Sequence, residues 1–237
     1  MNEEVARVDA AASFAAVAAV FSEAEHLTEL LALAVRLATT TVVPCARAGV
    51  VARRDGRLTS IAASDPEAHR LNELNLTLEQ GPAVDVLDTG QSVYVPDLSD
   101  DRRWPALARG AWGAGPVLAT SIEDGTDEPK ALVFYGAPGM AFDRIDRAHG
   151  VVFATHVSLA LSALQRHLRE HELAEQLRRG LDSRTVIGQA QGIVMARAGL
   201  NEREAFEVLR RASQHRNIKL REIAAYVVET GDIPTVD

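Results

Sequence analysis

The chain has 237 residues, of which 47% are apolar and 24% charged, with one cysteine and a formal net charge of −8. This length allows one large domain or two modest ones, and the composition excludes a largely disordered chain and a disulfide-stapled mini-protein. Cys45 alone cannot form an internal disulfide, the first residues are acidic, and no long uncharged apolar run occurs, so we expect a cytoplasmic protein without a secretory signal or a membrane span.

The first two thirds of the sequence alternate between helical and strand patterns. Apolar residues recur at helical spacing over residues 13–40. Arg54-Asp55-Gly56 is a typical hairpin turn between two predicted strands. Strands are expected at 48–52, 58–63, 92–95, 117–122 and 131–135, and helices at 66–78, 82–89 and 104–111. These elements predict an α+β fold in which helices flank an antiparallel sheet.

The last third of the sequence is predicted to be entirely helical. No proline interrupts residues 143–198, which favours one long connecting helix with Gly180 as the expected bend. Asn201 and Glu204 have the spacing of a capping box, which predicts a second helix to about His215, and a third is expected over 219–229. We place the domain boundary between 1–165 and an all-α, three-helix domain at 166–237.

Charge is unevenly distributed between these two domains. Residues 1–165 contain 13 Lys and Arg against 22 Asp and Glu, whereas residues 166–237 contain 12 against 11. Within 176–221, ten basic residues occur with four acidic ones, a net charge of +6. A basic segment joined to an acidic domain indicates that a negatively charged partner would bind the C-terminal domain.

Basic side chains on predicted helices are typical of nucleic-acid binding, because the planar guanidinium of arginine fits phosphates and base edges. On the helix after Asn201, the helical period predicts that Phe206 and Leu209 face a core and that Arg210 faces outward. A solvated face with Glu–Arg pairing is the alternative. The candidate contact residues are Arg184, Arg197, Arg210, Arg211, Arg216, Lys219 and Arg221.

Motifs for catalysis, metal binding and cofactor binding are weak. His167 and His171 share a helical face, but no third metal ligand is indicated, so a solvated surface is the better interpretation. Cys45 has no nearby His or cationic cluster in sequence that would lower the pKa of its thiol, which favours core packing. We therefore predict no enzyme activity, no metal and no cofactor.

Three segments carry a resemblance to a known family: the run from Arg184 to Leu200, which contains Ile187-Gly188-Gln189-Ala190, then Glu204-Ala205-Phe206 and Lys219-Leu220-Arg221. Together they closely resemble the ANTAR family over about residues 170–230. This resemblance implies an RNA-binding module of transcription antiterminators, which binds small hairpins in nascent transcripts and prevents an intrinsic terminator from forming. One position departs from the family pattern. Gln191 stands where members usually have lysine, so a charge contact is expected to be missing.

The first domain is similar to GAF domains that are joined to ANTAR tails. The resemblance rests on Leu78–Pro82, Val84–Gly90, Val93–Leu98, Arg103–Pro105 and Phe142-Asp143, and it covers about residues 15–165. It implies a sensor of a small molecule or a dimerisation unit, with the ligand undetermined. The single Cys45 argues against the methionine sulfoxide reductases of this fold, which need more than one thiol.

Two alternatives to an RNA-binding regulator remain. The helical tail of a GAF sensor could dock on a protein partner, which would favour an exposed apolar stripe. An enzyme could also be hidden in the GAF pocket, but this requires converging titratable residues. Leu161, Leu164 and Leu168 at spacings of three and four predict a homodimer through the connecting helices, with intramolecular packing of these leucines as the alternative.

Overall fold

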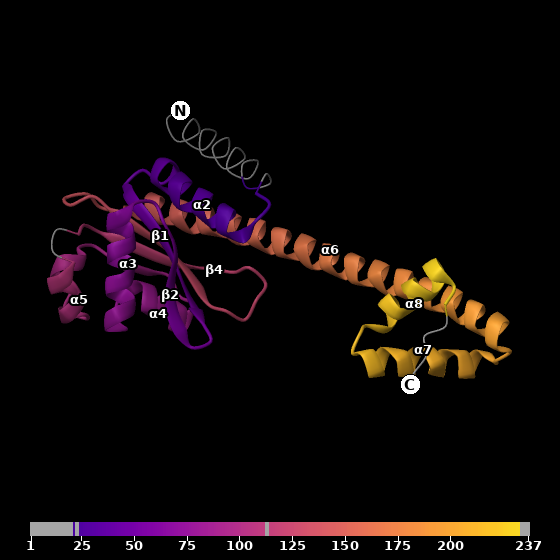
Figure 1. Cartoon of the computed structure of the whole chain (residues 1–237). Helices are drawn as coiled ribbons and strands as arrows, with labels where there is room; N and C mark the ends of the chain where they lie inside the picture. Colours follow the sequence, from indigo (N-terminus) through magenta and orange to yellow (C-terminus); the bar gives the residue numbers. More distant parts are fainter. Residues whose placement is uncertain (1–20, 22–23, 112–113, 233–237) are drawn as a thin grey trace, which may run out of the picture. The chain divides into compact units, whose positions relative to one another are not determined.

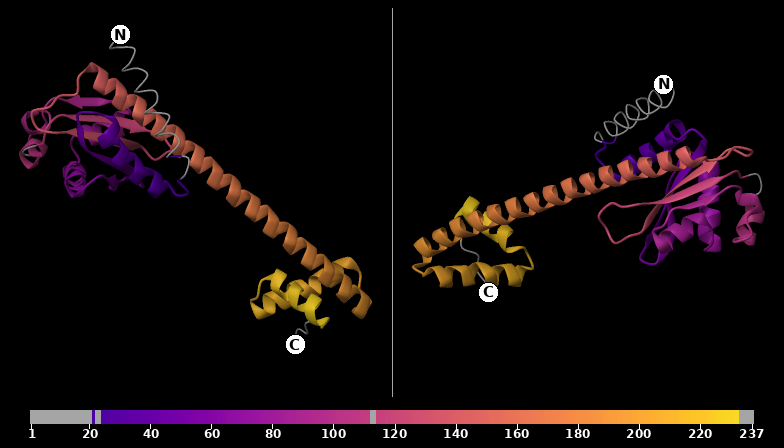
Figure 2. Two further views of the ribbon diagram at one scale, coloured as in Figure 1. Left: turned by 90° about the horizontal axis from the view of Figure 1, so that it is seen from above. Right: turned by 180° about the vertical axis from the view of Figure 1, so that it is seen from behind.

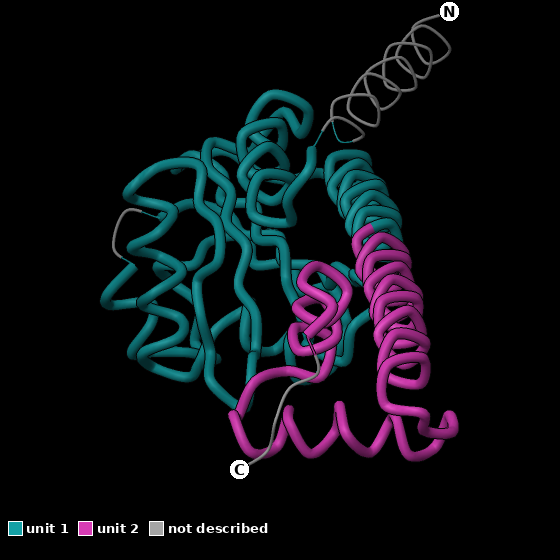
Figure 3. Tube along the Cα trace, turned by 45° about the vertical axis from the view of Figure 1, so that its right-hand side comes forward, with its two compact units in different colours: residues 1–167 teal, residues 168–237 magenta. Residues whose placement is uncertain are grey.

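The structure is a computed structural model that describes residues 21, 24–111 and 114–232. The predicted helical stretch at residues 13–20 lies outside these ranges. The chain divides into two compact units, unit 1 at Met1–His167 and unit 2 at Leu168–Asp237 (Figure 3). Helix α6, at Arg144–Ala198, contributes residues to both units.

Unit 1 is built on a five-stranded antiparallel sheet (Figure 1). In the order β2-β1-β5-β4-β3, the strands are β2 (Arg57–Ala63), β1 (Cys45–Arg54), β5 (Lys130–Gly136), β4 (Val117–Ile122) and β3 (Val93–Val95). The predicted turn between β1 and β2 is confirmed. Asp55 and Gly56 have φ of 51° and 76°, the left-handed values that a two-residue hairpin turn requires.

Helices cover both faces of this sheet (Figure 2). One face carries α2 (Leu27–Thr41) and the first part of α6; the other carries α3 (Pro66–Leu78), α4 (Pro82–Thr89), the short helix η1 (Leu98–Asp100) and α5 (Pro105–Gly110). The strand period of two divides β5 between the layers. Leu132 and Phe134 pack toward α2 and α6, whereas Val133 and Tyr135 pack toward α3–α5. The predicted α+β arrangement is confirmed.

The first part of α6 is part of the core of unit 1. Phe153 and Val157 are fully buried, and a Cβ at Gly150 would lie 2.5 Å from Leu118 Cδ2, so a larger residue at 150 would require the Leu118 side chain to move. Leu161 is buried in the same core and Leu164 packs against it. Leu161 and Leu164 therefore follow the intramolecular alternative and face their own domain, whereas Leu168 is half-buried and lies outside this core.

Unit 2 is a three-helix domain of the last part of α6 with α7 (Glu202–Arg216) and α8 (Leu220–Thr230). The capping box at Asn201 and Glu204 is confirmed by reciprocal hydrogen bonds of 3.0 Å. Its core consists of Ala190, Val194, Ala205, Leu209, Ala212, Ile223, Ala224 and Val227.

Two local expectations for the helical region differ from the structure. Helix α6 continues through Gly180 without interruption, since a single glycine costs a helix only about 1 kcal/mol. Phe206 is half-buried and lies outside the core of unit 2, because α6 and α8 cover the neighbouring Ala205 and Leu209 instead. Across the described ranges, no helix has the length and apolar character needed to cross a membrane.

Candidate nucleic-acid interface and sensor junction

The turn between α7 and α8 holds three of the candidate cations at the surface of unit 2. Asn217 ends α7 in the left-handed conformation, with φ of 51°. The Ser213 hydroxyl donates to the Ile218 carbonyl at 2.6 Å, and the Ile218 amide donates to the Ser213 carbonyl at 3.1 Å. This hydrogen-bonded turn positions Arg216, Lys219 and Arg221, whose side chains are exposed.

Arg210 and Arg211 are adjacent on α7 but differ in their surroundings. The Arg210 guanidinium contacts the Glu207 carboxylate at 2.7 Å, and this hydrogen bond lowers the pKa of Glu207. Arg211 is exposed and makes no ion pair within the described residues. Arg211 is therefore available to an external anion, whereas Arg210 must first leave its internal partner.

Arg197 lies at the opposite end of α8 from Lys219 and Arg221. Its guanidinium lies 3.9 Å from the Asp232 carboxylate and so close to Gly231, the C-cap of α8, that a Cβ there would be 2.8 Å from its nitrogen. A cation at a helix C-terminus is stabilising because the backbone carbonyls there are partly negative. The structure thus separates Arg197 from the cations at the α7–α8 turn and places it at the C-terminal end of α8.

A groove of about 320 Å³ lies between α6 and the first turns of α8. Its residues are Arg179, Asp182, Ser183 and Val186 from α6 and Arg221, Glu222 and Ala225 from α8. Arg179 was not among the sequence candidates, because the sequence does not show that its helix turn lies opposite Arg221. The candidate Arg184 lies roughly 140° around α6 from Arg179, at 3.6 residues per turn, and does not line the groove.

Gln191 has a role inside unit 2. Its side-chain amide donates to the Glu202 backbone carbonyl at 3.0 Å and so ties α6 to the first residue of α7. The residue at this position therefore contributes to packing between helices in this chain. Unit 2 also presents aromatic surface, from Tyr226 on α8, which is 44% exposed, and from the half-buried Phe206 on α7.

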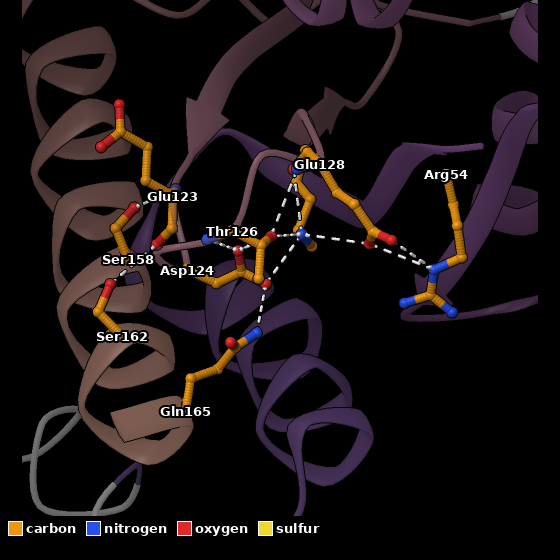
Figure 4. Close-up of polar contacts among 9 residues, drawn as sticks. Arg54, Glu123, Asp124, Thr126, Glu128, Ser158, Ser162 and Gln165 are labelled. Carbon is orange, nitrogen blue, oxygen red and sulfur yellow. Dashed lines mark hydrogen bonds and ion pairs between the residues drawn. The ribbon is translucent and has the colours of Figure 1, made fainter. Parts of the chain in front are cut away.

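In unit 1, a buried polar network joins the turn after β4 to α6 (Figure 4). Lys130 Nζ lies 2.8 Å from Asp124 Oδ2, and the two side chains are only 6% and 4% exposed. Gln165 of α6 donates its amide to the same carboxylate oxygen at 2.8 Å. Thr126 donates its hydroxyl to the other oxygen of Asp124 and accepts from Lys130 at 3.1 Å. Both carboxylate oxygens of Asp124 therefore have hydrogen-bond partners within the chain.

The electrostatics of this network favour the ion pair. Burial alone would raise the pKa of Asp124, but hydrogen bonds from Lys130 and Thr126 together with the Lys130 charge outweigh it, and the pKa lies below its usual value. Two serines of α6 extend the junction along the same turn. Ser158 accepts from the Glu123 amide at 3.0 Å, and Ser162 donates to the Glu123 carbonyl at 3.5 Å.

Cys45 lies in the core of unit 1, 3% exposed, and its thiol donates to the Arg47 carbonyl at 3.0 Å. Burial raises the pKa of this thiol to about 12. The prediction of a core-packing cysteine is confirmed, and the thiol is protonated at neutral pH. Where the chain is described, no group of three or more His, Cys, Asp or Glu has the arrangement of a metal site.

A second groove, of about 490 Å³, lies in unit 1 beside the first turns of α6. Tyr94, Leu118, Arg147, Val151 and Val152 are among its lining residues. The Arg147 guanidinium carbon lies 4.7 Å from the centre of the Tyr94 ring, a cation–π distance. Val151 and Val152 are 40% and 41% exposed, so this side of α6 presents apolar surface.

Comparison with known families gives two matches. The family described as GAF domain matches residues 24–162, and the family described as ANTAR domain matches residues 175–228. No curated protein matches the chain in sequence. The two matched ranges lie on either side of the boundary between unit 1 and unit 2, apart from the helix α6 that enters both.

Solved structures share the fold of unit 1. The GAF domain of a phosphoenolpyruvate-protein phosphotransferase from Coxiella burnetii has a TM-score of 0.52 and 17% identity, covering 70% of this chain and 98% of that one. The equivalent domain from Acinetobacter has a TM-score of 0.51 and 14% identity, covering 68% and 97%. The free methionine-R-sulfoxide reductase of Neisseria meningitidis, solved with its substrate, has a TM-score of 0.51 and 12% identity, covering 67% and 93%.

Proposed function

The chain belongs to the GAF-domain family and carries an ANTAR domain, and from this premise we propose that it regulates transcription antitermination by binding hairpins in nascent RNA. Unit 2 is the RNA-binding part, and unit 1 senses a small molecule and controls that binding. Nascent transcripts place its site of action in the cytoplasm. The candidates from the sequence remain proposed RNA contacts. Among them, Arg184 lies off the groove, Arg210 is paired with Glu207, and Arg197 lies at the C-terminal end of α8.

The observation that supports this proposal most directly is the set of exposed cations on the second half of α7 and on the α7–α8 turn. Arg211, Arg216 and Lys219 are exposed and, among described residues, form no ion pair. Several exposed, unpaired positive charges on one small domain attract anions, and RNA supplies a row of phosphates. Hairpin loops add splayed bases that can stack on exposed rings such as Tyr226.

The test is binding of the full chain to a pool of RNA hairpins at several salt concentrations. We expect affinity to fall steeply with salt, because each phosphate contact releases a counterion. A triple Arg211→Ala, Arg216→Ala, Lys219→Ala variant should lose most of this binding. The control is Arg169→Ala, which removes an exposed arginine of α6 that is not among the proposed RNA contacts and should leave binding unchanged. Unchanged binding by the triple variant would place the interface elsewhere.

A protein partner for unit 2 is the competing function, and exposed apolar residues give it some support. Ile218 is 40% exposed, Tyr226 44% and Val228 36%. Docking of a protein on these residues would depend weakly on salt, would be lost in a Val228→Ser variant and would persist in the triple cation variant. The salt dependence of binding and the opposite effects of these two variants thus separate the two functions.

We infer that the chain is not an enzyme. The GAF fold is shared with a methionine sulfoxide reductase, but here the one thiol, Cys45, is buried and protonated. A nucleophilic thiol needs exposure and a lowered pKa. We expect that the parent chain reduces free methionine sulfoxide no faster than a Cys45→Ala variant does. A rate that depends on Cys45 would contradict the inference.

The network in Figure 4 is our candidate for the connection between sensor and helix. Gln165 is the α6 residue whose side chain contacts the buried Asp124–Lys130 pair. A shift of the turn after β4 would therefore displace the Gln165 side chain of α6, which lies two residues before the end of unit 1. Thermal-shift screening would first find a small molecule that binds unit 1. We then expect that Gln165→Ala leaves the affinity for RNA nearly unchanged but abolishes the effect of this molecule on that affinity.

A homodimer remains part of the proposal, with a different seam from the one that the leucine spacing suggested. Ile145, Val152 and Leu159 recur every seven residues on α6, on the side away from the core of unit 1, and are 60%, 41% and 64% exposed. This spacing is typical of helices that pair with a second copy. Val152 also lines the groove beside Tyr94, which extends the apolar surface.

Light scattering tests this seam. Leu159→Glu should convert the dimer to a monomer, because a second copy would bury an unpaired charge. Met140→Glu adds the same charge at another exposed apolar position, 50% exposed and off the helix, and should leave the dimer intact. A monomeric parent chain at tens of micromolar would remove the dimer from the proposal.

A further inference from the structure

The groove between α6 and α8 differs in charge from the basic turn beside it. Two guanidiniums, of Arg179 and Arg221, and two carboxylates, of Asp182 and Glu222, line it, so its formal charge is zero. All four side chains are exposed, and none has an ion-pair partner among the residues described. A phosphate bound inside would meet both carboxylates, so the groove suits an uncharged group with polar edges.

The shape of the groove restricts that group further. Val186 and Ala225 give apolar surface, and Ser183 contributes a hydroxyl that already donates to the Arg179 carbonyl at 2.7 Å. A volume of about 320 Å³ is at the lower end of ligand pockets, which run from about 300 to 1,000 Å³. One flat ring system fits such a space, with its faces on the aliphatic side chains and its edge toward the carboxylates.

A nucleobase has this combination of properties. Ionised carboxylates only accept hydrogen bonds, so they select a base edge that donates. Adenine, cytosine and guanine carry an exocyclic amino group, whereas uracil presents carbonyl oxygens in its place. Unstacked loop bases expose these edges, because they are free of Watson–Crick pairing.

We propose that this groove binds one unstacked, amino-bearing base of the RNA loop, with Asp182 and Glu222 accepting from its amino group. Arg179 and Arg221 flank the base and contact the adjoining phosphates. Lys219, the N-cap of α8, lies two residues before Arg221, so the phosphate surface continues directly from the groove. This inference rests on the proposed RNA-binding function and assigns its base-reading residues.

The experiment uses a synthetic pool of RNA hairpins with one common stem and a randomised loop, selected on the full chain and sequenced. The parent should enrich loops in which one position excludes uracil. In an Asp182→Asn, Glu222→Gln variant, side-chain amides can also donate to carbonyls, so uracil at that position should rise about fivefold or more while other loop positions keep their preference. These substitutions preserve side-chain size.

A second variant tests the space itself. Ala225→Leu fills the groove and should weaken binding of the best selected hairpin about tenfold or more. Ala196→Leu adds the same bulk at an exposed position of α6 outside the groove and should bind like the parent. Circular dichroism shows whether each variant is folded. If Ala225→Leu is unfolded, the loop preference of the isosteric Asp182→Asn, Glu222→Gln variant tests the proposal.

The failures of the two proposals are distinguishable. If the parent enriches no hairpin, RNA binding and the base-binding groove both fall. If the parent selects defined loops, but the double variant keeps the same preference at every loop position, RNA binding stands and the groove is not its base-reading site, whatever general gain in affinity follows from the loss of two negative charges.

Discussion

Lys130 of unit 1 and the arginines of unit 2 carry the same charge in very different surroundings. Lys130 is 6% exposed and has Asp124, Thr126 and the Glu128 carbonyl as partners. Arg211 and Arg216 are exposed, with no ion pair in the described part of the chain. A cation whose partners are all internal holds a turn in place, whereas a cation left in solvent is available to a ligand. The comparison therefore separates a structural charge from a binding one.

The largest effect is expected where that internal pairing is broken. Lys130→Met leaves the Asp124 carboxylate buried without its cation and should lower the free energy of unfolding of unit 1 by about 3–5 kcal/mol. Denaturant unfolding followed by tryptophan fluorescence measures this loss. Arg54→Met is the matched control, since Arg54 is 67% exposed and pairs with the outer carboxylate Glu128, and it should cost far less stability than Lys130→Met. Equal losses would mean that burial does not distinguish these cations.

Removing one solvent-exposed cation should affect binding and leave folding intact. Arg216→Ala should weaken all selected hairpins to a similar extent and make the plot of log affinity against log salt shallower by about one unit. Stability of the variant should match the parent, because the guanidinium has no ion pair in the described structure. RNA titration at two salt concentrations, with thermal unfolding in parallel, checks both halves. A stability loss without a change in salt dependence would make Arg216 a structural residue.

Arg210 tests the comparison at an intermediate case. Its pairing with Glu207 competes with RNA, so Arg210→Ala should cost less affinity than Arg211→Ala. Glu207→Gln should tighten RNA binding by about twofold to fivefold, since exposed ion pairs are worth only about 0–1 kcal/mol and the change also removes a negative charge. Titration of the three variants against one hairpin gives the order. Weaker binding by Glu207→Gln would show that the pair positions Arg210 for RNA.

The smallest predicted effect is that of pH on the stability contribution of Asp124, which should not change near neutral pH. The pKa of Asp124 is lowered in the folded chain, so its contribution to stability is complete above the unfolded value of about 3.9 and is lost as pH falls through the folded value. The difference in unfolding free energy between the parent and Asp124→Asn should therefore be constant from about pH 5 to 7 and shrink in stronger acid. A difference that grows on acidification would contradict the lowered pKa.

Much of the local structure follows from short-range patterns. The alternation around Asp55-Gly56 determined the β1–β2 hairpin, and the spacing of Asn201 and Glu204 determined the start of α7, because both depend on neighbouring residues alone. The basic segment over 176–221 was visible as composition. The order of elements was sufficient to predict the α+β unit and the all-helical domain after it.

Tertiary packing decided which face of each helix is covered. Leu161 fits a pairing seam by spacing, but the sheet of unit 1 covers it, whereas Leu159 two residues earlier stays 64% exposed. Spacing reports that residues share a face and does not report what that face meets. Phe206 remained outside the core of unit 2 for the same reason.

The functional groupings also depended on contacts between residues distant in sequence. Asp124 and Gln165 are hydrogen-bonded across 41 positions, and Arg179 meets Arg221 at one groove although they lie on different helices. The sequence by itself determined the two domains, their helices and strands, and the charge of the C-terminal segment. Only the tertiary structure divided the cations into Arg197 at a helix end, Lys130 in a buried network and Arg211 in solvent, because burial and pairing are properties of packed elements.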